Sequence, residues 1–195
     1  MQALKKLFLT LTILSLSGLT FAMQKPLTDD EIVRLQTAMI AKKGLFEAIE
    51  NQDIGKAKMQ LDFIKNVLKM KLNFINMLGD TLLIKAIALN TDIGDEIALL
   101  LIQAGADVNK ADQANGNTPL HMTVLTGNVH LAQILLNAGA KTTVMNSGGY
   151  TPEHMVNELI TDLETTSKPH TKRRQTLINA YMELKSMLRP KMMRR

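Results

Sequence analysis

Residues 116–121 read Gly-Asn-Thr-Pro-Leu-His, and this motif decides the fold of the 195-residue chain. It recurs 33 positions later as Gly-Tyr-Thr-Pro-Glu-His, where Thr151 takes the place of Thr118. A third copy at residues 79–83 reads Gly-Asp-Thr-Leu-Leu, and its Thr81 lies 37 positions before Thr118. A period in this range is the signature of a stacked array of structural repeats.

Each copy of the motif predicts a helix start, and a glycine predicts the end of the following helix. Pro119 follows Thr118 directly, an arrangement in which threonine caps the helix and proline occupies its first position. Gly105 and Gly139 follow apolar helical runs, where a left-handed residue commonly ends a helix. The short segments between these glycines and the next motif are rich in Asn, Asp and Gly, which favours hairpins. One helical pair buries little apolar surface alone, so stacking has to supply the core.

The longer of the two periods contains four extra residues. Three of them fall around residues 91–94, between the two helices of that repeat, and one falls between Lys110 and Asn115. We therefore expect both insertions to lie in turns, which tolerate added residues.

These motifs resemble the ankyrin repeat family, whose unit of about 33 residues is a turn or hairpin followed by two antiparallel helices. The likeness is most specific in residues 112–144, which carry the Thr-Pro-Leu-His motif and the mid-repeat Gly127. Residues 79–111 form a second good match. Residues 44–78 look like a degenerate repeat, and residues 145–167 look like a partial one.

The resemblance implies an all-α solenoid of stacked helix pairs with short hairpin turns. It also implies that His121 and His154 form hydrogen bonds between neighbouring repeats. His154 has a second reading as a metal ligand together with Glu158, because residues four apart share a helix face. A catalytic zinc site needs three protein ligands, so the structural role is the preferred interpretation.

Helical caps are expected at both ends of the array. Residues 23–43 contain an acidic helix start at 28–31 followed by apolar residues at helical spacing. Residues 168–195 contain an amphipathic helix that ends near Pro190 and can close the last repeat. Its basic flanks leave membrane docking as an alternative role.

Residues 1–22 have the features of a cleavable signal peptide. Lys5 and Lys6 precede an apolar run, and Thr20 and Ala22 supply the small residues that a signal peptidase reads. We expect cleavage after Ala22 and export of the product. The chain has no cysteine and no Asn-x-Ser/Thr sequon, which favours a bacterial protein that is periplasmic or secreted.

The formal net charge of +5 is divided unevenly along the chain. Residues 168–195 carry nine basic residues and one acidic residue, whereas residues 23–167 carry 12 basic and 17 acidic residues. The basic end could bind an anionic surface or an acidic partner, or be a solvated helix end. The cations of this anionic-surface alternative are Lys168, Lys172, Arg173, Arg174, Arg189, Lys191, Arg194 and Arg195.

Residue types that carry chemistry are scarce in this sequence. The absence of cysteine excludes disulfides, thiolate metal sites and a cysteine nucleophile. No serine-hydrolase elbow, phosphate loop or dinucleotide fingerprint occurs. With no Trp, two Tyr and five Phe, no nucleic-acid partner is expected. We therefore predict a protein that is not an enzyme and needs no cofactor.

The predicted function is protein binding, in the bacterial envelope or outside the cell, with a host-directed secreted effector as an alternative. The resemblance implies that contacts come from hairpin tips and from the exposed side of the first helix of each repeat. Leu89 and Leu125 are expected to offer apolar groups to solvent. Carried over by position, the candidate contact residues are Ile75, Met77, Ala88, Leu89, Lys110, Asp112, Gln113, Asn115, Leu125, Thr126, Met145, Asn146 and Ser147.

Overall fold

A computed structural model describes residues 28–165 and 172–188, without the side chains of 172–174. The expected signal peptide at 1–22, the residues between it and Thr28, and the cations at Lys168, Arg189, Lys191, Arg194 and Arg195 lie outside this part. The described helices are α2 (Asp29–Glu50), α3 (Ile54–Asp62), the π-helical η1 (Phe63–Leu68), α4 (Leu82–Ala88), α5 (Asp92–Gln103), α6 (Pro119–Thr126), α7 (Val129–Asn137), α8 (Pro152–Thr165) and α9 (Lys172–Leu188).

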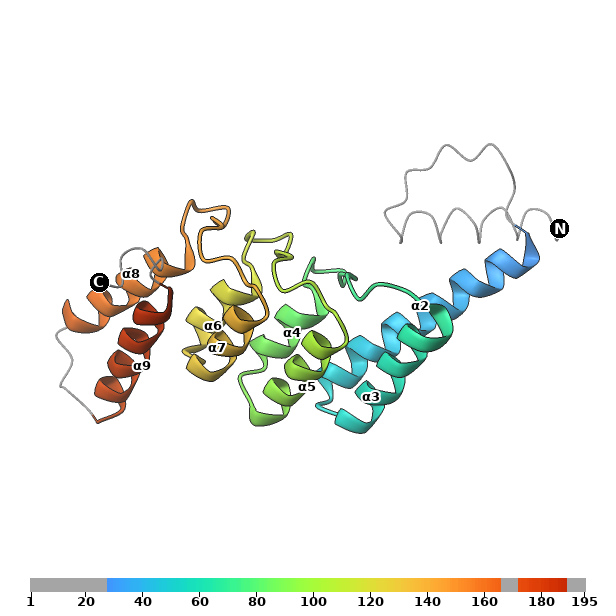
Figure 1. The fold of residues 1–195 in the computed structure, drawn as a ribbon, viewed down its shortest axis with the longest axis horizontal. Coiled ribbons are helices and arrows are strands. Elements are labelled where there is room, and N and C mark those ends of the chain that lie inside the picture. The colour runs from blue at the N-terminus through green and yellow to red at the C-terminus, as the bar shows by residue number, and fades with distance from the viewer. Residues whose placement is uncertain (1–27, 166–171, 189–195) are drawn as a thin grey trace.

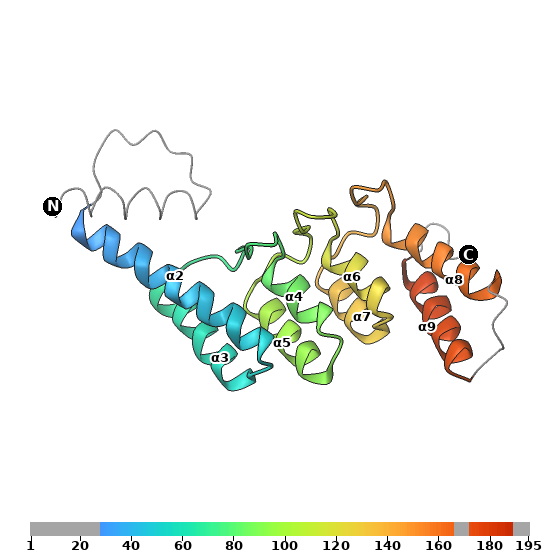
Figure 2. The same cartoon turned by 180° about the vertical axis from the view of Figure 1, so that it is seen from behind.

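The helices form four pairs that stand side by side in one row (Figure 1). The pairs are α2/α3, α4/α5, α6/α7 and α8/α9, and the first helices contact one another along the row. The view from behind shows the long connecting loops on one side of the row (Figure 2). Within the described residues the only strand-like pairing is an isolated bridge between Ile75 and Thr81. The prediction of an all-α solenoid is confirmed.

The Thr-Pro motifs start first helices as predicted. Thr81 Oγ1 accepts a hydrogen bond from the backbone N–H of Ile84 at 3.1 Å, and α4 begins at the next residue, Leu82. Pro119 and Pro152 are the first residues of α6 and α8. Proline fits there because the first helical N–H has no partner inside the helix.

The glycine caps of the second helices are also confirmed. Gly105 and Gly139 have φ values of +89° and +91°, in the left-handed region that favours glycine. After each glycine, the N–H of the next alanine returns to the helix: Ala106 donates to Leu101 O, and Ala140 donates to Leu135 O. This pattern satisfies the last carbonyl groups of α5 and α7.

The three extra residues of the longer period lie in a helix and not in the turn that we expected. α5 has 12 residues and α7 has nine. Their N-caps, Thr91 and Asn128, each lie ten positions after the capping threonine of their own repeat. The turn therefore keeps its length, and the insertion adds helical residues that can still stack.

The one-residue insertion does lie in a hairpin. Asn76 N donates to Asp80 O, and Asn146 N donates to Tyr150 O, so each hairpin is closed across four residues. In the middle hairpin, Asp112 N donates to Asn117 O across five.

The N-terminal cap and the first helix of the degenerate repeat are one continuous helix. α2 begins after Thr28, whose hydroxyl caps Glu31 N while the Glu31 carboxylate accepts from Thr28 N. It then passes through the expected boundary at 43/44, where Gly44 is helical and packs beneath the side chain of Gln60. The second helix runs from α3 into the π-helical η1 and ends at Lys69, with φ of +49°.

The C-terminal helix closes the stack as predicted. α9 packs against α8 and α7, and its buried side chains are Ile178, Tyr181, Leu184 and Leu188. α9 therefore completes a fourth helical pair with α8, where we expected a partial repeat and a separate cap. Its described part ends at Leu188, two residues before Pro190.

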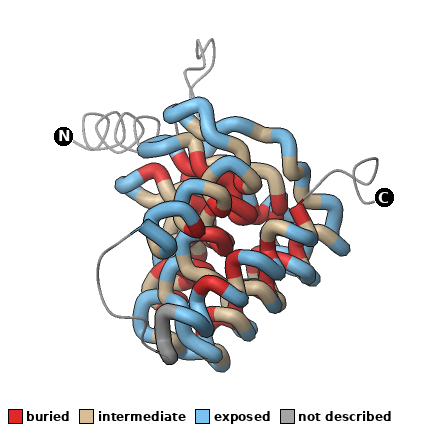
Figure 3. The backbone as a smooth tube through the Cα atoms, turned by 90° about the vertical axis from the view of Figure 1, so that its left-hand side faces the viewer, coloured by how far each residue is buried: buried red, intermediate tan, exposed pale blue. Residues whose placement is uncertain are grey.

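The core is continuous along the row. Seen from one end of the row, buried backbone lies between the helical layers and exposed backbone lies outside (Figure 3). Leu83 and Ile87 of α4, Leu101 of α5 and Leu131 of α7 are among its fully buried members. Each helical pair thus relies on its neighbours for burial.

A close approach between α4 and α5 predicts a sensitive glycine. A Cβ added to Gly94 in α5 would lie 2.7 Å from the backbone oxygen of Ala86 in α4. We expect Gly94→Ala to lower the free energy of unfolding by about 1–3 kcal/mol, because the backbone of α4 cannot move aside cheaply. Urea unfolding measures this change.

Gly55→Ala in α3 is the matched control. The nearest atom to its added Cβ is Asp53 Oδ1 at 3.4 Å, which is ordinary contact. This change should stabilise the protein by up to about 1 kcal/mol through helix propensity. Equal effects of the two substitutions would contradict the close packing of α4 and α5.

Candidate protein-interaction surface

Successive hairpins are joined by backbone hydrogen bonds. Gln113 N donates to Gly79 O at 3.0 Å, and Ser147 N donates to Asn115 O at 2.8 Å. A Cβ on Gly79 would lie 2.7 Å from Gln113 Cβ, and one on Gly116 would lie 2.8 Å from Ser147 Oγ. Glycine at these positions lets each hairpin contact the next, and the hairpins form a continuous edge on one side of the row (Figure 1).

An Asn or Asp side chain shapes the inside of each hairpin. Asn76 Oδ1 accepts from the N–H groups of Leu78 and Asp80. Asn146 Oδ1 accepts in the same way from Gly148 and Tyr150. Such side-chain acceptors hold the turn in a fixed shape.

The middle hairpin corrects one expectation of the sequence analysis. Asp112 is only 6% exposed, and its carboxylate accepts from Asn115 N at 2.6 Å. It therefore holds the turn from inside and is not a contact at the hairpin tip. Asn146 is half-buried, and its amide donates to Asn117 Oδ1 at 2.9 Å. Its side chain also links two repeats.

His121 joins the third helical pair to the next hairpin, as the resemblance implied. The N–H of Thr118 can only donate, so His121 Nδ1 accepts from it at 3.2 Å. Nε2 then carries the proton and donates to the carbonyl oxygen of Tyr150 at 2.9 Å. Burial lowers the pKa of His121, while the bond to Tyr150 and the charge of Asp112 oppose this shift. The neutral ring is the form that fits.

His154 does not repeat this arrangement. Its side chain is exposed, and its own N–H donates to Thr151 Oγ1 at 3.3 Å. No further hairpin follows α8 in the described residues, so the ring has no carbonyl group to reach there. The expectation of an inter-repeat bond from His154 was wrong. In the part of the chain that was searched, no three His, Asp or Glu residues cluster as a metal site.

Most of the predicted tip residues are exposed. Met77 is 96% exposed, Met145 is 62% exposed, and Gln113, Asn115 and Ser147 are also exposed. Ile75 and Lys110 are half-buried instead. Two further apolar residues, Leu78 and Tyr150, are exposed and were not predicted. Each is next to a hairpin glycine, which is the signal that could have identified them.

The first helices contribute fewer contacts than expected. Ala88 and Leu125 are exposed as predicted. Leu89 is half-buried and packs against the core, because α4 ends there and the chain turns toward Gly94. Thr126 is also half-buried, and its hydroxyl donates to Met122 O at 3.1 Å. Among the large apolar residues that were predicted as contacts, the exposed ones are Met77 and Met145 on the hairpins and Leu125 on α6.

The hairpin edge presents apolar side chains in a fixed arrangement. It presents Met77, Leu78, Met145 and Tyr150 on a backbone fixed by the bonds between hairpins. Apolar side chains on a rigid frame are suited to protein contacts. Among the described helices, none is both long enough and apolar enough to span a membrane.

Repeated helical pairs that expose a row of hairpins define a class of repeat proteins built for binding. A profile of ankyrin repeats, in three copies, matches residues 41–146, which is more than half of the chain. The chain belongs to the ankyrin repeat family.

Several curated proteins share part of this sequence. The chain is 48% identical over 59 residues to a putative palmitoyltransferase, ZDHHC13, of Danio rerio, covering 30% of this chain and 9% of that protein. It is 32% identical over 103 residues to the putative ankyrin repeat protein FPV031 of fowlpox virus, covering 52% of this chain and 30% of that protein. It is also 47% identical over 58 residues to the ADP-ribosylation factor GTPase-activating protein AGD4 of Arabidopsis thaliana, covering 29% of this chain and 7% of that protein. The similarity thus spans less than a third of each of these relatives.

The environment of His121 predicts a pH-dependent contribution to stability. Its pKa is lowered in the folded protein, so the unfolded chain binds the proton more readily below pH about 6.5. We expect His121→Asn to lower the free energy of unfolding by about 2 kcal/mol at pH 8, because the buried N–H of Thr118 and the carbonyl oxygen of Tyr150 lose their hydrogen bonds to the ring. As the pH falls through the pKa of folded His121, wild type loses this advantage, so the two stabilities converge.

Urea unfolding of both proteins from pH 8 to pH 5 measures this difference. The difference in free energy of unfolding between the two proteins at pH 8, where the ring is neutral, is the reference for the values at lower pH. A gap that stays constant or widens toward pH 5 would contradict the neutral, doubly bonded ring.

Proposed function

We propose that this chain is an exported, non-catalytic module that binds another protein through its hairpin edge. The observation that carries the proposal is the exposure of Met77 and Met145, together with Leu78 and Tyr150, at the tips of hairpins that hydrogen bonds fix in place. A partner surface with apolar groups would remove these side chains from water. Because the hairpins are already ordered, little conformational entropy is lost on binding.

Polar tip residues supply the specificity in this proposal. Gln113, Asn115 and Ser147 are exposed, and the backbones of all three already take part in the bonds between hairpins. Their side chains can therefore form hydrogen bonds with a partner without disturbing the hairpin backbone. Ala88 and Leu125 extend the surface onto α4 and α6.

The proposed site of action is outside the cytoplasm. Residues 1–22 support it, with their two lysines, apolar run and Thr20-Phe21-Ala22 end. Action in a bacterial periplasm is the first choice, and a secreted, host-directed effector is the alternative. In expressing bacteria, we expect the product to begin at Met23 and to leave the cytoplasm.

Mass spectrometry of cell fractions tests this proposal. Recovery in the periplasmic fraction supports an envelope role, and recovery in culture fluid supports the secreted effector. A matched chain without residues 2–22 should stay in the cytoplasm. Full-length protein in the cytoplasm would contradict export.

A role at an anionic surface would depend on the charge of residues 168–195. The apolar face of α9 is occupied, because Tyr181, Leu184 and Leu188 are buried against the stack. The alternative therefore rests on cations such as Lys168 and Arg195 and not on insertion of α9 into a membrane. Replacing these cations with glutamine isolates the charge, whereas deleting residues 168–195 would also remove part of the core.

Binding through the hairpin edge predicts a loss of affinity in a double variant. Met77→Asp with Met145→Asp places a charge where the partner would bury an apolar group, so we expect affinity to fall about tenfold or more. Capture from periplasmic extract by immobilised protein identifies the partner, and titration with the purified partner measures affinity.

Met182→Asp is the control, since Met182 is also an exposed methionine but lies in helix α9 and not in a hairpin. All variants should unfold within about 0.5 kcal/mol of wild type, because the changes are on the surface. Unchanged affinity in the double variant would contradict the proposed surface. Capture of no stoichiometric partner would count against the binding role.

A further inference from the structure

The outer face of the first helical pair is apolar although it ends the row. Ile40 of α2 and Met59 of α3 are 72% and 71% exposed, and Val33 and Val67 are also exposed. A terminal repeat ordinarily has a polar outer face, because no neighbour covers it. We call this surface the end face, defined by Val33, Thr37, Ile40, Met59, Phe63 and Val67.

The end face is hollowed between its two helices. A solvent-open groove of about 530 Å³ is lined by Thr37 and Ile40 on one side and by Met59 and Phe63 on the other. A groove between two helices can accept a row of side chains from a third helix.

One side of α2 carries a stripe of small and apolar residues. Val33, Thr37, Ile40 and Gly44 follow one another at intervals of four, three and four residues. The mean interval is about 3.7 residues, close to the 3.6 residues of one helical turn, so these four residues lie along one side of α2. The stripe has no packed neighbour at Val33 and Ile40, which are exposed.

The stripe is complementary to itself when two α2 helices run antiparallel. If the two copies meet between Gln36 and Thr37, Val33 of each lies opposite Ile40 of the other. A two-fold axis repeats every contact, so the Val33–Ile40 contact between the copies occurs twice.

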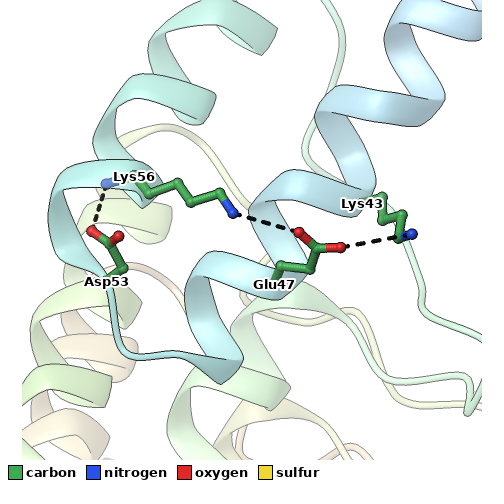
Figure 4. Close-up of polar contacts among 4 residues, drawn as sticks. All are labelled: Lys43, Glu47, Asp53 and Lys56. Carbon is green, nitrogen blue, oxygen red and sulfur yellow. Dashed lines mark hydrogen bonds and ion pairs between the residues drawn. The ribbon is translucent and has the colours of Figure 1, made fainter.

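Charges along α2 favour the same antiparallel direction. The first turn of α2 is acidic, with Asp29, Asp30 and Glu31. Further along the helix, Lys43 lies 3.7 Å from the Glu47 carboxylate, which Lys56 of α3 also approaches at 3.4 Å (Figure 4). The Lys43 side chain is 79% exposed, so a second copy can still reach it.

In the antiparallel register, Asp30 of one copy lies at the level of Lys43 of the other. A parallel pairing would place acidic turn against acidic turn. These charges lie on the surface, where salt screens them. They therefore favour the antiparallel over the parallel pairing but add little to the affinity of the dimer.

We propose that two copies of this chain pair through their end faces, with the α2 helices antiparallel about a two-fold axis at residues 36–37. The groove of each copy receives the Val33 and Ile40 ridge of the other. The hairpin edges remain uncovered, so the dimer would present two partner-binding surfaces. Loss of partner binding at the hairpin edge can therefore be distinguished from loss of dimerisation at the end face.

Sedimentation equilibrium of the full chain tests the pairing, with the mass of the product recorded to show whether residues 1–22 are present. We expect a dimer at about 100 µM, and Ile40→Asp should weaken its dissociation constant about tenfold or more. Met182→Asp, at the opposite end of the row, is the control and should leave the constant unchanged. A monomeric wild type, or equal weakening by both variants, overturns the proposal.

A single thiol tests the register. The chain has no cysteine, so Thr37→Cys gives one thiol that meets its own copy at the two-fold axis within disulfide range. Ser186→Cys is the matched control, because both hydroxyls donate to a carbonyl of their own helix at 2.8 Å on exposed surfaces.

We expect rapid covalent dimerisation by Thr37→Cys under mild oxidation and slow dimerisation by Ser186→Cys. Equal rates overturn the register. An end face that resists modification of Thr37→Cys in a monomeric chain would show that another segment covers it, which also overturns the proposal.

Discussion

The hydrogen bonds between successive hairpins are the constraint on which the rest of this molecule depends. They join Gly79 to Gln113 and Asn115 to Ser147 through backbone atoms alone, so the stack does not depend on which side chains the tips carry. The glycines at 79 and 116 are required because a Cβ would separate neighbouring hairpins. Because these tip side chains do not make the bonds between hairpins, they can be apolar, as Met77 and Met145 are, without loss of the fold.

Local capping rules explain how much of the fold could be predicted from the sequence. Thr81, Thr118 and Gly139 act through bonds to residues no more than five positions away, and a short motif can encode such bonds. The insertion in α5 was misplaced because spacing counts residues and does not report whether they are helical. α2 crosses an expected boundary, and Ala41 and Leu45 on the two sides of that boundary are both buried in the core, which a glycine in the sequence does not reveal.

The candidate site was predictable to a lesser extent. Exposure at Met77 and Met145 follows from their place in a hairpin. Asp112 turned inward because its carboxylate satisfies a backbone N–H of its own turn, and Leu89 turned inward because a helix ends there. Both depend on three-dimensional direction, which a position in a repeat does not specify. The apolar end face of α2 and α3 was not predicted, since its members are distant in sequence.

The two ends of the row differ in whether their apolar side chains are buried. At the C-terminal end, α9 fills the position of a second helix and buries its apolar side chains. At the N-terminal end, α2 and η1 leave Val33, Ile40 and Val67 exposed. The molecule therefore has a closed end, an apolar end and a hairpin edge, and each is suited to a different contact.

Amide hydrogen exchange at Gln113 and Ser147 is the most direct test of the hairpin contacts. Both residues are exposed at hairpin tips, where an amide ordinarily exchanges quickly. Donation to Gly79 O and Asn115 O should slow both amides strongly, while the N–H of exposed Leu78, which bonds only to a side chain of its own turn, exchanges faster. Exchange of Gln113 and Ser147 at the rate of an unfolded chain would contradict the continuous edge.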